Sequence, residues 1–260
     1  FPERLEDNGI SWRVYQNEIS LPTDVEDESL LANFTDNNLE WFSQFNVRYS
    51  SGFQKYIKAR QKELPSEIEE LEKNLNKQTG EKKEEYQKEL QKKRQQLEQI
   101  KKVLVIWNSD NFEKLSDFQK NLHQKAFTTN KADVDYHKVE ELSYDDNGVQ
   151  RSIKVPKGDI LYQFRQDVEQ GKLPTVSWLA APQKFSDHPS APWYGAWYVS
   201  EVLDILTKNP EVWKKTIFVL TYDENDGYFD HIPPCQFGTG KGKKGYGSRG
   251  SEGKPNRIGI

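Results

Sequence analysis

The stretch from Ile217 to Pro234, IFVLTYDENDGYFDHIPP, constrains the fold of this 260-residue chain more than any other. It begins with four bulky apolar residues, Ile217–Leu220, which lie between Pro210 and Gly227. A short apolar run that is rich in β-branched and aromatic residues and bounded by Pro and Gly predicts a buried strand. We therefore expect Ile217–Leu220 to be a central strand of an α/β sheet.

Acidic residues follow this predicted strand at once. Asp223 and Glu224 come first, and Asp226, Asp230 and His231 complete the cluster. In open α/β sheets, ligands bind just beyond the carboxyl ends of the strands. A pair of carboxylates at that place suits a hard divalent cation, which prefers several charged oxygen ligands. The sequence thus predicts a metal site at Asp223 and Glu224, and an acidic surface loop is the alternative.

The rest of the chain repeats a helix-then-strand step. A helical pattern begins at Pro2 and is closed by Gly9, and an alternating strand pattern then covers Ile10–Tyr15. A second helix is predicted over Asp159–Gln170, and a second strand follows over Thr175–Ala181. Such alternation is typical of an α/β fold.

A third helix, Trp193–Thr207, joins the strand Thr175–Ala181 to the strand Ile217–Leu220. A strand, helix, strand unit favours a parallel pair with a right-handed crossover. The loops after the two strands should then lie at one edge of the sheet, which would bring His188 toward Asp223 and Glu224. A lone His is more often a structural hydrogen-bonding residue, and topology alone does not place His123.

Two hairpins are predicted between these steps. Leu64–Trp107 carries heptad-like apolar spacing among Lys, Glu and Gln residues, interrupted at Gln78-Thr79-Gly80, and this predicts an antiparallel helical hairpin. Its mixed charges are typical of a solvated helix pair. Tyr136–Val155 alternates around Asn147-Gly148, the strongest short signal for a β-hairpin.

Composition excludes several classes of protein. The net charge of −4 does not favour nucleic acid as a partner. Cys235 is the single cysteine, so neither an internal disulfide nor a CxxC metal motif is available. No apolar run approaches the roughly 20 residues needed for a transmembrane helix, and the first residues show no signal-peptide pattern. The chain contains no Met and ends on Arg257–Ile260, which is similar to the start of a strand, so we expect it to be a fragment of a longer protein.

Several segments together resemble a known family. TYDENDGYFDHIPP, FSDHPSAPWYGAWYVSEVLDIL and LPTVSWLAAP are similar to the bacterial phosphocholine-type phospholipases C, and so are KNLHQKAFTTN, DYHKVEELSYDDNG and FPERLEDNGISWRVYQ. These enzymes are grouped with acid phosphatases in the phosphoesterase branch of the alkaline phosphatase superfamily. The resemblance covers nearly the whole chain except the helical hairpin.

The resemblance implies a three-layer αβα fold of the alkaline-phosphatase type and hydrolysis of phosphate esters with a divalent metal ion. Asp223 and Glu224 match the paired metal-binding acids of the family, and His188 matches its phosphate-contacting His. His123 is similar to a second active-site His. The resemblance also implies a phospholipid or small phosphoester substrate, peripheral contact with a membrane, and export to the periplasm or beyond. Members carry a Glu-Asn metal motif and a hydroxyl nucleophile upstream, and we expect both to lie outside this chain.

We therefore expect an α/β catalytic domain in two parts, residues 1–63 and 108–260, with a helical hairpin inserted at residues 64–107. The predicted activity is that of a phospholipase C that releases diacylglycerol and phosphocholine. Two alternatives are an acid phosphatase that acts on phosphomonoesters and a non-catalytic module that binds a partner through the helical hairpin.

Overall fold

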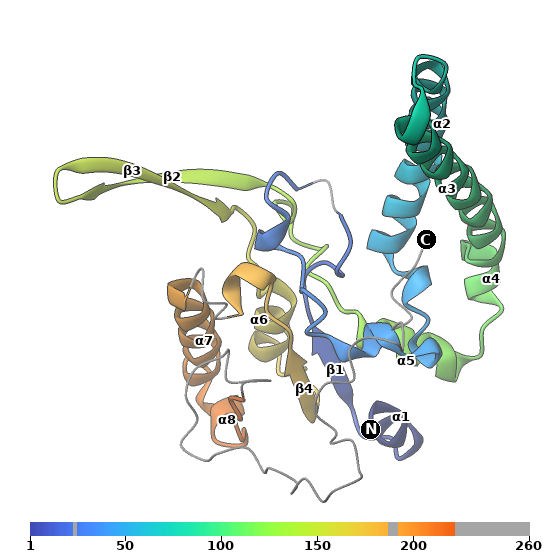
Figure 1. The fold of residues 1–260 in the computed structure, drawn as a ribbon. Coiled ribbons are helices and arrows are strands. Elements are labelled where there is room, and N and C mark those ends of the chain that lie inside the picture. The colour runs from blue at the N-terminus through green and yellow to red at the C-terminus, as the bar shows by residue number, and fades with distance from the viewer. Residues whose placement is uncertain (23–24, 187–191, 222–260) are drawn as a thin grey trace, which may run out of the picture. The chain divides into compact units, whose positions relative to one another are not determined.

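A computed structural model describes residues 1–22, 25–186 and 192–221 (Figure 1). The chain divides into two compact units, Phe1–Lys215 and Thr216–Gly259. The elements below belong to the first unit unless stated otherwise, and they form a mixed α/β structure.

A parallel pair of strands lies at the centre of the first unit. β1 (Trp12–Tyr15) pairs with β4 (Val176–Leu179), in register from Trp12 opposite Val176 to Tyr15 opposite Leu179. Thr128 continues the pairing on the other side of β1, because its amide donates to the Val14 carbonyl at 3.2 Å. Both strands were predicted from sequence, and the parallel pairing joins segments that are far apart in the chain.

Helices contact both faces of this strand pair. Successive side chains of a strand point to opposite faces, so Trp12 lies on one face of β1 and Arg13 and Tyr15 on the other. The Trp12 indole donates to Glu6 of α1 (Pro2–Asp7) at 2.9 Å. The Tyr15 hydroxyl donates to Asp167 of α6 (Tyr162–Glu169) at 2.6 Å. The two-stranded sheet therefore has helices on either side, as in a layered α/β fold.

The predicted helical hairpin is confirmed. α2 (Ser51–Leu75) and α3 (Gly80–Ile106) are joined by a short turn that ends at Gly80, whose φ of +60° favours glycine. Leu64, Leu90 and Ile100 are buried along the hairpin. The first helix begins at Ser51, well before the predicted start of the hairpin at Leu64.

The predicted β-hairpin is also confirmed. β2 (Val139–Asp146) and β3 (Val149–Pro156) pair antiparallel across Asn147 and Gly148. These two residues have φ angles of +53° and +86°, as a two-residue turn that matches the twist of the strands requires. Most of its side chains are exposed, so the hairpin extends from the packed part of the unit.

Further helices complete the first unit. α5 (Asp117–Ala126) starts with a capping box in which Ser116 and Gln119 exchange side-chain and backbone hydrogen bonds. α6 ends before Gly171, at φ +66°, and α7 (Pro192–Thr207) agrees with the prediction. The remaining helices are α4 (Ser109–Glu113), α8 (Pro210–Trp213) and the 3-10 turns Glu28–Leu30, Asn38–Trp41, Ser43–Phe45, Val47–Tyr49 and Gln183–Phe185.

The prediction of a buried strand over Ile217–Leu220 is wrong in this structure. These residues belong to the second unit, have no strand pairing, and leave Ile217 90% exposed and Val219 72% exposed. A strand forms only where a neighbour takes its backbone hydrogen bonds, and no described strand does so here. The predicted parallel partner, β4, pairs with β1 instead.

Candidate functional site

The sequence-predicted metal and phosphate residues lie outside the described part of the chain. Asp223 and Glu224 follow residue 221, and His188 falls in the gap between residues 186 and 192. Within residues 1–22, 25–186 and 192–221, no group of three or more His, Cys, Asp or Glu side chains is arranged to hold a metal ion. The prediction of a metal site at Asp223 and Glu224 therefore remains a prediction.

The structure does describe the sheet edge that leads toward His188. At the carboxyl ends of β1 and β4, the Ala180 amide donates to the Tyr15 carbonyl at 2.9 Å. Three residues further on, the Gln183 amide donates to the Ala32 carbonyl at 2.7 Å. The chain that follows β4 thus runs beside the residues that follow β1. This is the edge at which parallel α/β sheets bind ligands.

A buried amide cluster occupies this edge directly after β1. It consists of Gln16, Asn33, Asn37 and Glu40, which are each at most 4% exposed. The Asn33 amide donates to Glu40 at 2.7 Å and to Gln16 at 3.3 Å. The Asn37 amide donates to Gln16 and, at 2.8 Å, to the Ala126 carbonyl at the end of α5. Because buried polar groups need partners, these bonds fix the loop after β1 against α5.

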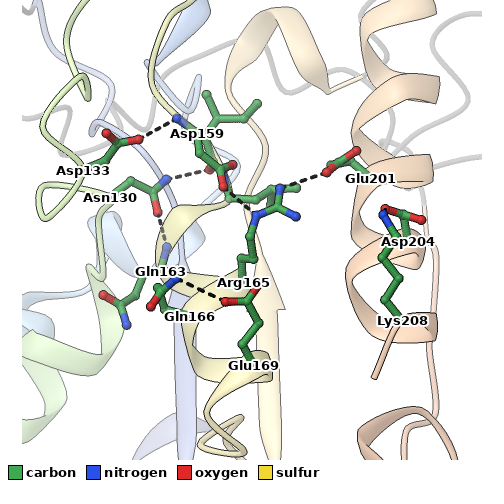
Figure 2. Close-up of polar contacts among 12 residues, drawn as sticks. Asn130, Asp133, Asp159, Gln163, Arg165, Gln166, Glu169, Glu201, Asp204 and Lys208 are labelled. Carbon is green, nitrogen blue, oxygen red and sulfur yellow. Dashed lines mark hydrogen bonds and ion pairs between the residues drawn. The ribbon is translucent and has the colours of Figure 1, made fainter. Parts of the chain in front are cut away.

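A second buried pair of amides attaches the same loop to α6. Asn130 donates to Asn17 at 2.8 Å and to the Ile160 carbonyl at 2.6 Å, and Asn17 donates to that carbonyl at 3.2 Å. The Asn130 side-chain oxygen accepts from the Gln163 amide in the first turn of α6 at 2.9 Å (Figure 2). This last bond satisfies the backbone amide of Gln163, which has no acceptor within its own helix.

Arg165 of α6 extends the network to α7. Figure 2 shows its guanidinium between Asp159, at 2.7 Å, and Glu201 of α7, at 2.9 Å. The Asp159 amide in turn donates to the Asp133 carboxylate at 2.7 Å. The segment around Asn130 and Asp133, α6 and α7 are thus joined by charged and amide groups, and α7 is the helix that follows the segment containing His188.

Glu18 and His137 form a carboxylate–imidazole pair that sequence reasoning missed. His137 Nε2 lies 2.8 Å from a Glu18 carboxylate oxygen, and Glu18 is 5% exposed. Gly52 in the first turn of α2 lies against the other oxygen, since a Cβ there would be only 2.7 Å from it. The pair joins residues 119 positions apart, so no local sequence signal identifies it.

His123, a predicted catalytic residue, lies in an aromatic environment on α5. Its Nδ1 is 3.0 Å from the Phe45 carbonyl, and the rings of Phe112 and Phe127 lie 5.3 and 5.4 Å away. A carbonyl oxygen only accepts, so Nδ1 carries the proton and Nε2 is the acceptor of the neutral imidazole. Burial lowers the pKa of His123 below 6.5, which favours this neutral form at pH 7. The catalytic role of His123 stays a prediction.

The buried carboxyl of Glu40 in the amide cluster makes the free energy of unfolding depend on pH. Burial raises the pKa of its carboxyl from 4.5 to about 7, although the hydrogen bond from Asn33 partly opposes this shift. The folded chain therefore keeps a proton that the unfolded chain releases near pH 4.5. The free energy of unfolding should fall as the pH rises from 4.5 to 7, by on the order of 2–3 kcal/mol.

Glu40→Gln should remove this pH dependence, because the amide keeps an acceptor for Asn33 and does not ionise. We expect urea unfolding at pH 5 and pH 8 to give a smaller difference in unfolding free energy for the variant than for the wild type, by about 2 kcal/mol. Glu211→Gln, at an exposed position on α8, is the control and should leave the difference unchanged. A Glu40→Gln variant with the wild-type pH dependence would contradict the buried, protonated carboxyl.

Comparison with known proteins gives one family match. Residues 108–260, more than half of the chain, match the model of the Phosphoesterase family. This range contains Asp223, Glu224, His188 and His123. It excludes the helical hairpin α2–α3.

Individual relatives match a smaller part of the chain. Over 78 residues the chain is 55% identical to a non-hemolytic phospholipase C of Burkholderia pseudomallei, and over 83 residues it is 48% identical to a hemolytic phospholipase C of Pseudomonas aeruginosa. Each match covers 30% of this chain and 11% of the relative. A non-specific phospholipase C4 of Arabidopsis thaliana is 38% identical over 80 residues, which are 14% of its length. The matched region is thus a small part of each relative.

Proposed function

This chain belongs to the Phosphoesterase family, and we propose that the protein is a metal-dependent phosphoester hydrolase that acts as a phospholipase C. Its substrate would be a phosphocholine lipid, and its products diacylglycerol and phosphocholine. The observation that carries the proposal is the family match over residues 108–260, together with relatives named phospholipase C at 48–55% identity. Those relatives are matched over about a tenth of their length, so the activity is a proposal for this protein.

Asp223 and Glu224 are the proposed metal ligands. Two adjacent carboxylates supply the charged oxygens that a hard divalent cation prefers, and both residues lie in the family-matched range. When bound, such an ion polarises a phosphoryl oxygen and offsets the charge that develops during transfer. The proposal assigns these two carboxylates to the ion because they stand together just after the apolar run Ile217–Leu220.

The two proposed catalytic histidines would have different roles. His188 would contact the phosphate or donate a proton to the leaving oxygen, as a general acid does. His123 has its Nδ1 proton directed at the Phe45 carbonyl and a pKa lowered by burial. Its neutral imidazole therefore suits a role as a hydrogen-bond acceptor at Nε2 better than a role as a proton donor.

The same proposal includes the detailed fold of the catalytic domain and the location of the protein in the cell. The helices on both faces of the β1–β4 pair support a three-layer αβα domain of the alkaline-phosphatase type, in which the described strands would form part of a larger sheet. Export from the cytoplasm and peripheral contact with a membrane would fit a phospholipid substrate. None of the helices in the described ranges is long and apolar enough to cross a bilayer.

A comparison of substrates tests the proposal against an acid phosphatase. We expect the protein to hydrolyse p-nitrophenylphosphorylcholine, a diester, at least about tenfold faster than p-nitrophenyl phosphate, a monoester, because a site that binds phosphocholine loses its contacts with choline in the monoester, and tenfold corresponds to only about 1.4 kcal/mol. Both reactions release p-nitrophenol and are followed at one wavelength. Faster hydrolysis of the monoester would favour the phosphatase, and hydrolysis of neither would reject the proposed function.

A further inference from the structure

The turn formed by residues 33–36 holds two successive non-glycine residues in the left-handed region. Phe34 has a φ of +50° and Thr35 a φ of +70°. For a bulky or β-branched residue this conformation is a genuine outlier, because Cβ comes too close to the following carbonyl oxygen. The other non-glycine residues with positive φ in the described ranges are Asn46 and Asn147, and asparagine tolerates this region. The backbone of residues 33–36 is therefore strained.

Hydrogen bonds from the buried amide cluster hold this turn in place. Asn33 is 0% exposed. Its side-chain oxygen accepts from the Ser20 hydroxyl at 2.6 Å and from the Thr35 amide at 3.0 Å, and its carbonyl accepts from the Asp36 amide at 3.0 Å. Its side-chain amide donates to Glu40 at 2.7 Å. Strained residues persist only where the surrounding structure fixes them, and these bonds do so here.

The packing of the fold does not account for the two side chains on the turn. Glycine adopts positive φ angles without steric cost, so a turn of this shape is least strained with glycine at both positions. The side chain of Phe34 is 55% exposed and Thr35 is half-buried, so burial offsets only part of the strain. Strain of this kind is concentrated at active sites and ligand clamps. The turn therefore points to a function that needs its side chains.

The turn lies at the edge at which parallel α/β sheets bind ligands. The carbonyl of Ala32, directly before the turn, accepts from the Gln183 amide at 2.7 Å. Gln183 belongs to the segment that follows β4, and it precedes His188 by five residues in the sequence. The ring of Phe34 is thus held on the same edge as the segment that leads to the proposed phosphate-contacting histidine.

An exposed aromatic ring at this edge suits the apolar group that a phosphoester carries next to its phosphate. A hydrocarbon group would cover the ring because both surfaces leave water. A quaternary ammonium group would be attracted to the face of the ring by a cation–π interaction. A free phosphate ion would gain from neither contact. Such a ring distinguishes substrates by the group that is esterified to the phosphate.

We propose that Phe34 is a specificity-determining residue that contacts the apolar group esterified to the substrate phosphate, and that the strained turn fixes its ring at the sheet edge. This role rests on the proposed phosphoester hydrolysis. It also gives the amide cluster beside β1 a function, because the cluster holds the turn. Asn33 is then a positioning residue, since it acts on the substrate only through the turn.

Steady-state kinetics with p-nitrophenylphosphorylcholine test the role of the ring. Phe34→Ala keeps Cβ, and with it the backbone strain, and removes only the ring. We expect KM to rise at least about fivefold, which corresponds to about 1 kcal/mol and to the burial of roughly 40 Å² of apolar surface. The value of kcat should stay unchanged, as it does when a contact present in both ground state and transition state is lost.

Two further variants are the controls. Phe34→Tyr keeps an aromatic ring and should restore the wild-type KM. Phe42→Ala removes a ring that is 52% exposed, at a residue with an ordinary φ of −105°, and should leave KM unchanged. An equal rise of KM in Phe34→Ala and Phe42→Ala would overturn the specific role of Phe34.

Two competitive inhibitors identify the group that covers the ring. Phosphocholine and hexyl phosphate share the phosphate, and they carry a quaternary ammonium group and a hydrocarbon chain, respectively. Phe34→Ala should weaken inhibition by at least one of them about fivefold and leave inhibition by inorganic phosphate unchanged. Unchanged inhibition by both esters, or an equal loss for inorganic phosphate, would overturn the proposal.

Urea unfolding tests the strain separately. Thr35→Gly should raise the urea midpoint, because glycine adopts a φ of +70° without steric cost. Asn147→Gly should raise it less, because asparagine already tolerates the left-handed region. A lower midpoint in Thr35→Gly than in the wild type would contradict a strained turn.

Hydrolysis by the wild-type protein separates this role from the proposed function. If the wild type does not hydrolyse p-nitrophenylphosphorylcholine, both the proposed function and the role of Phe34 are rejected. If the wild type hydrolyses it and Phe34→Ala has an unchanged KM, only the role of Phe34 is rejected.

Discussion

Asp223→Asn is expected to lower the hydrolysis of p-nitrophenylphosphorylcholine at least about 100-fold, the order of loss seen when one charge-stabilising group is removed from an active site. The substitution keeps the shape of the side chain but replaces a charged oxygen with an amide. A hard divalent cation binds a neutral amide less tightly than a carboxylate. Metal content and turnover should therefore fall together, and Glu224→Gln should behave in the same way.

The matched control for this prediction is Asp204→Asn. Asp204 is an exposed acid on α7 that pairs with Lys208 at 2.5 Å, and its replacement should leave both metal content and turnover unchanged. Turnover that is retained in Asp223→Asn with a normal metal content would rule out Asp223 as a ligand.

Asp167→Ala is expected to lower the free energy of unfolding by about 2–4 kcal/mol, the largest effect on stability that we predict. Asp167 is 5% exposed on α6 and accepts from the Tyr15 hydroxyl at 2.6 Å and from Gln163 at 2.9 Å. It also forms an ion pair with Arg13. Removing the carboxylate leaves the Tyr15 hydroxyl and the Arg13 guanidinium without this acceptor.

The partial exposure of Arg13 limits the stability that Asp167→Ala can remove. Its side chain is 32% exposed, so water would replace part of the lost interaction. Asp204→Ala is the control, because its pair with Lys208 is exposed and such pairs contribute at most about 1 kcal/mol. Equal losses of stability in Asp167→Ala and Asp204→Ala, measured by urea unfolding, would contradict the anchoring of α6 to β1.

Elements with strong local signals could be predicted from the sequence. The turn at Asn147-Gly148 requires positive φ angles, and these residues adopt them at little cost, so the β-hairpin follows from two adjacent residues. The heptad-like spacing that includes Leu64, Leu90 and Ile100 likewise identified the helical hairpin, although α2 begins earlier, at Ser51. In both cases the residues that determine the structure lie within the element itself or in its turn.

Features that depend on distant partners could not be predicted. Ile217–Leu220 has the composition of a buried strand, but a strand also needs a neighbour, and apolar composition does not supply one. The pairing of Glu18 with His137 and the burial of Glu40 both arise from tertiary packing. The candidate site was predicted from the resemblance and the acidic cluster, whereas the amide cluster beside β1 carries no motif that would identify it.

The most direct test of a metal-dependent phosphoester hydrolase is to measure bound metal and the hydrolysis of p-nitrophenylphosphorylcholine in the same sample, before and after chelation and after metal is restored. We expect turnover to disappear when the metal is removed and to return in proportion to metal occupancy when it is restored. In Asp223→Asn, turnover should be low at every stage and should not rise when metal is added. Full turnover in a metal-free, folded protein would contradict the account.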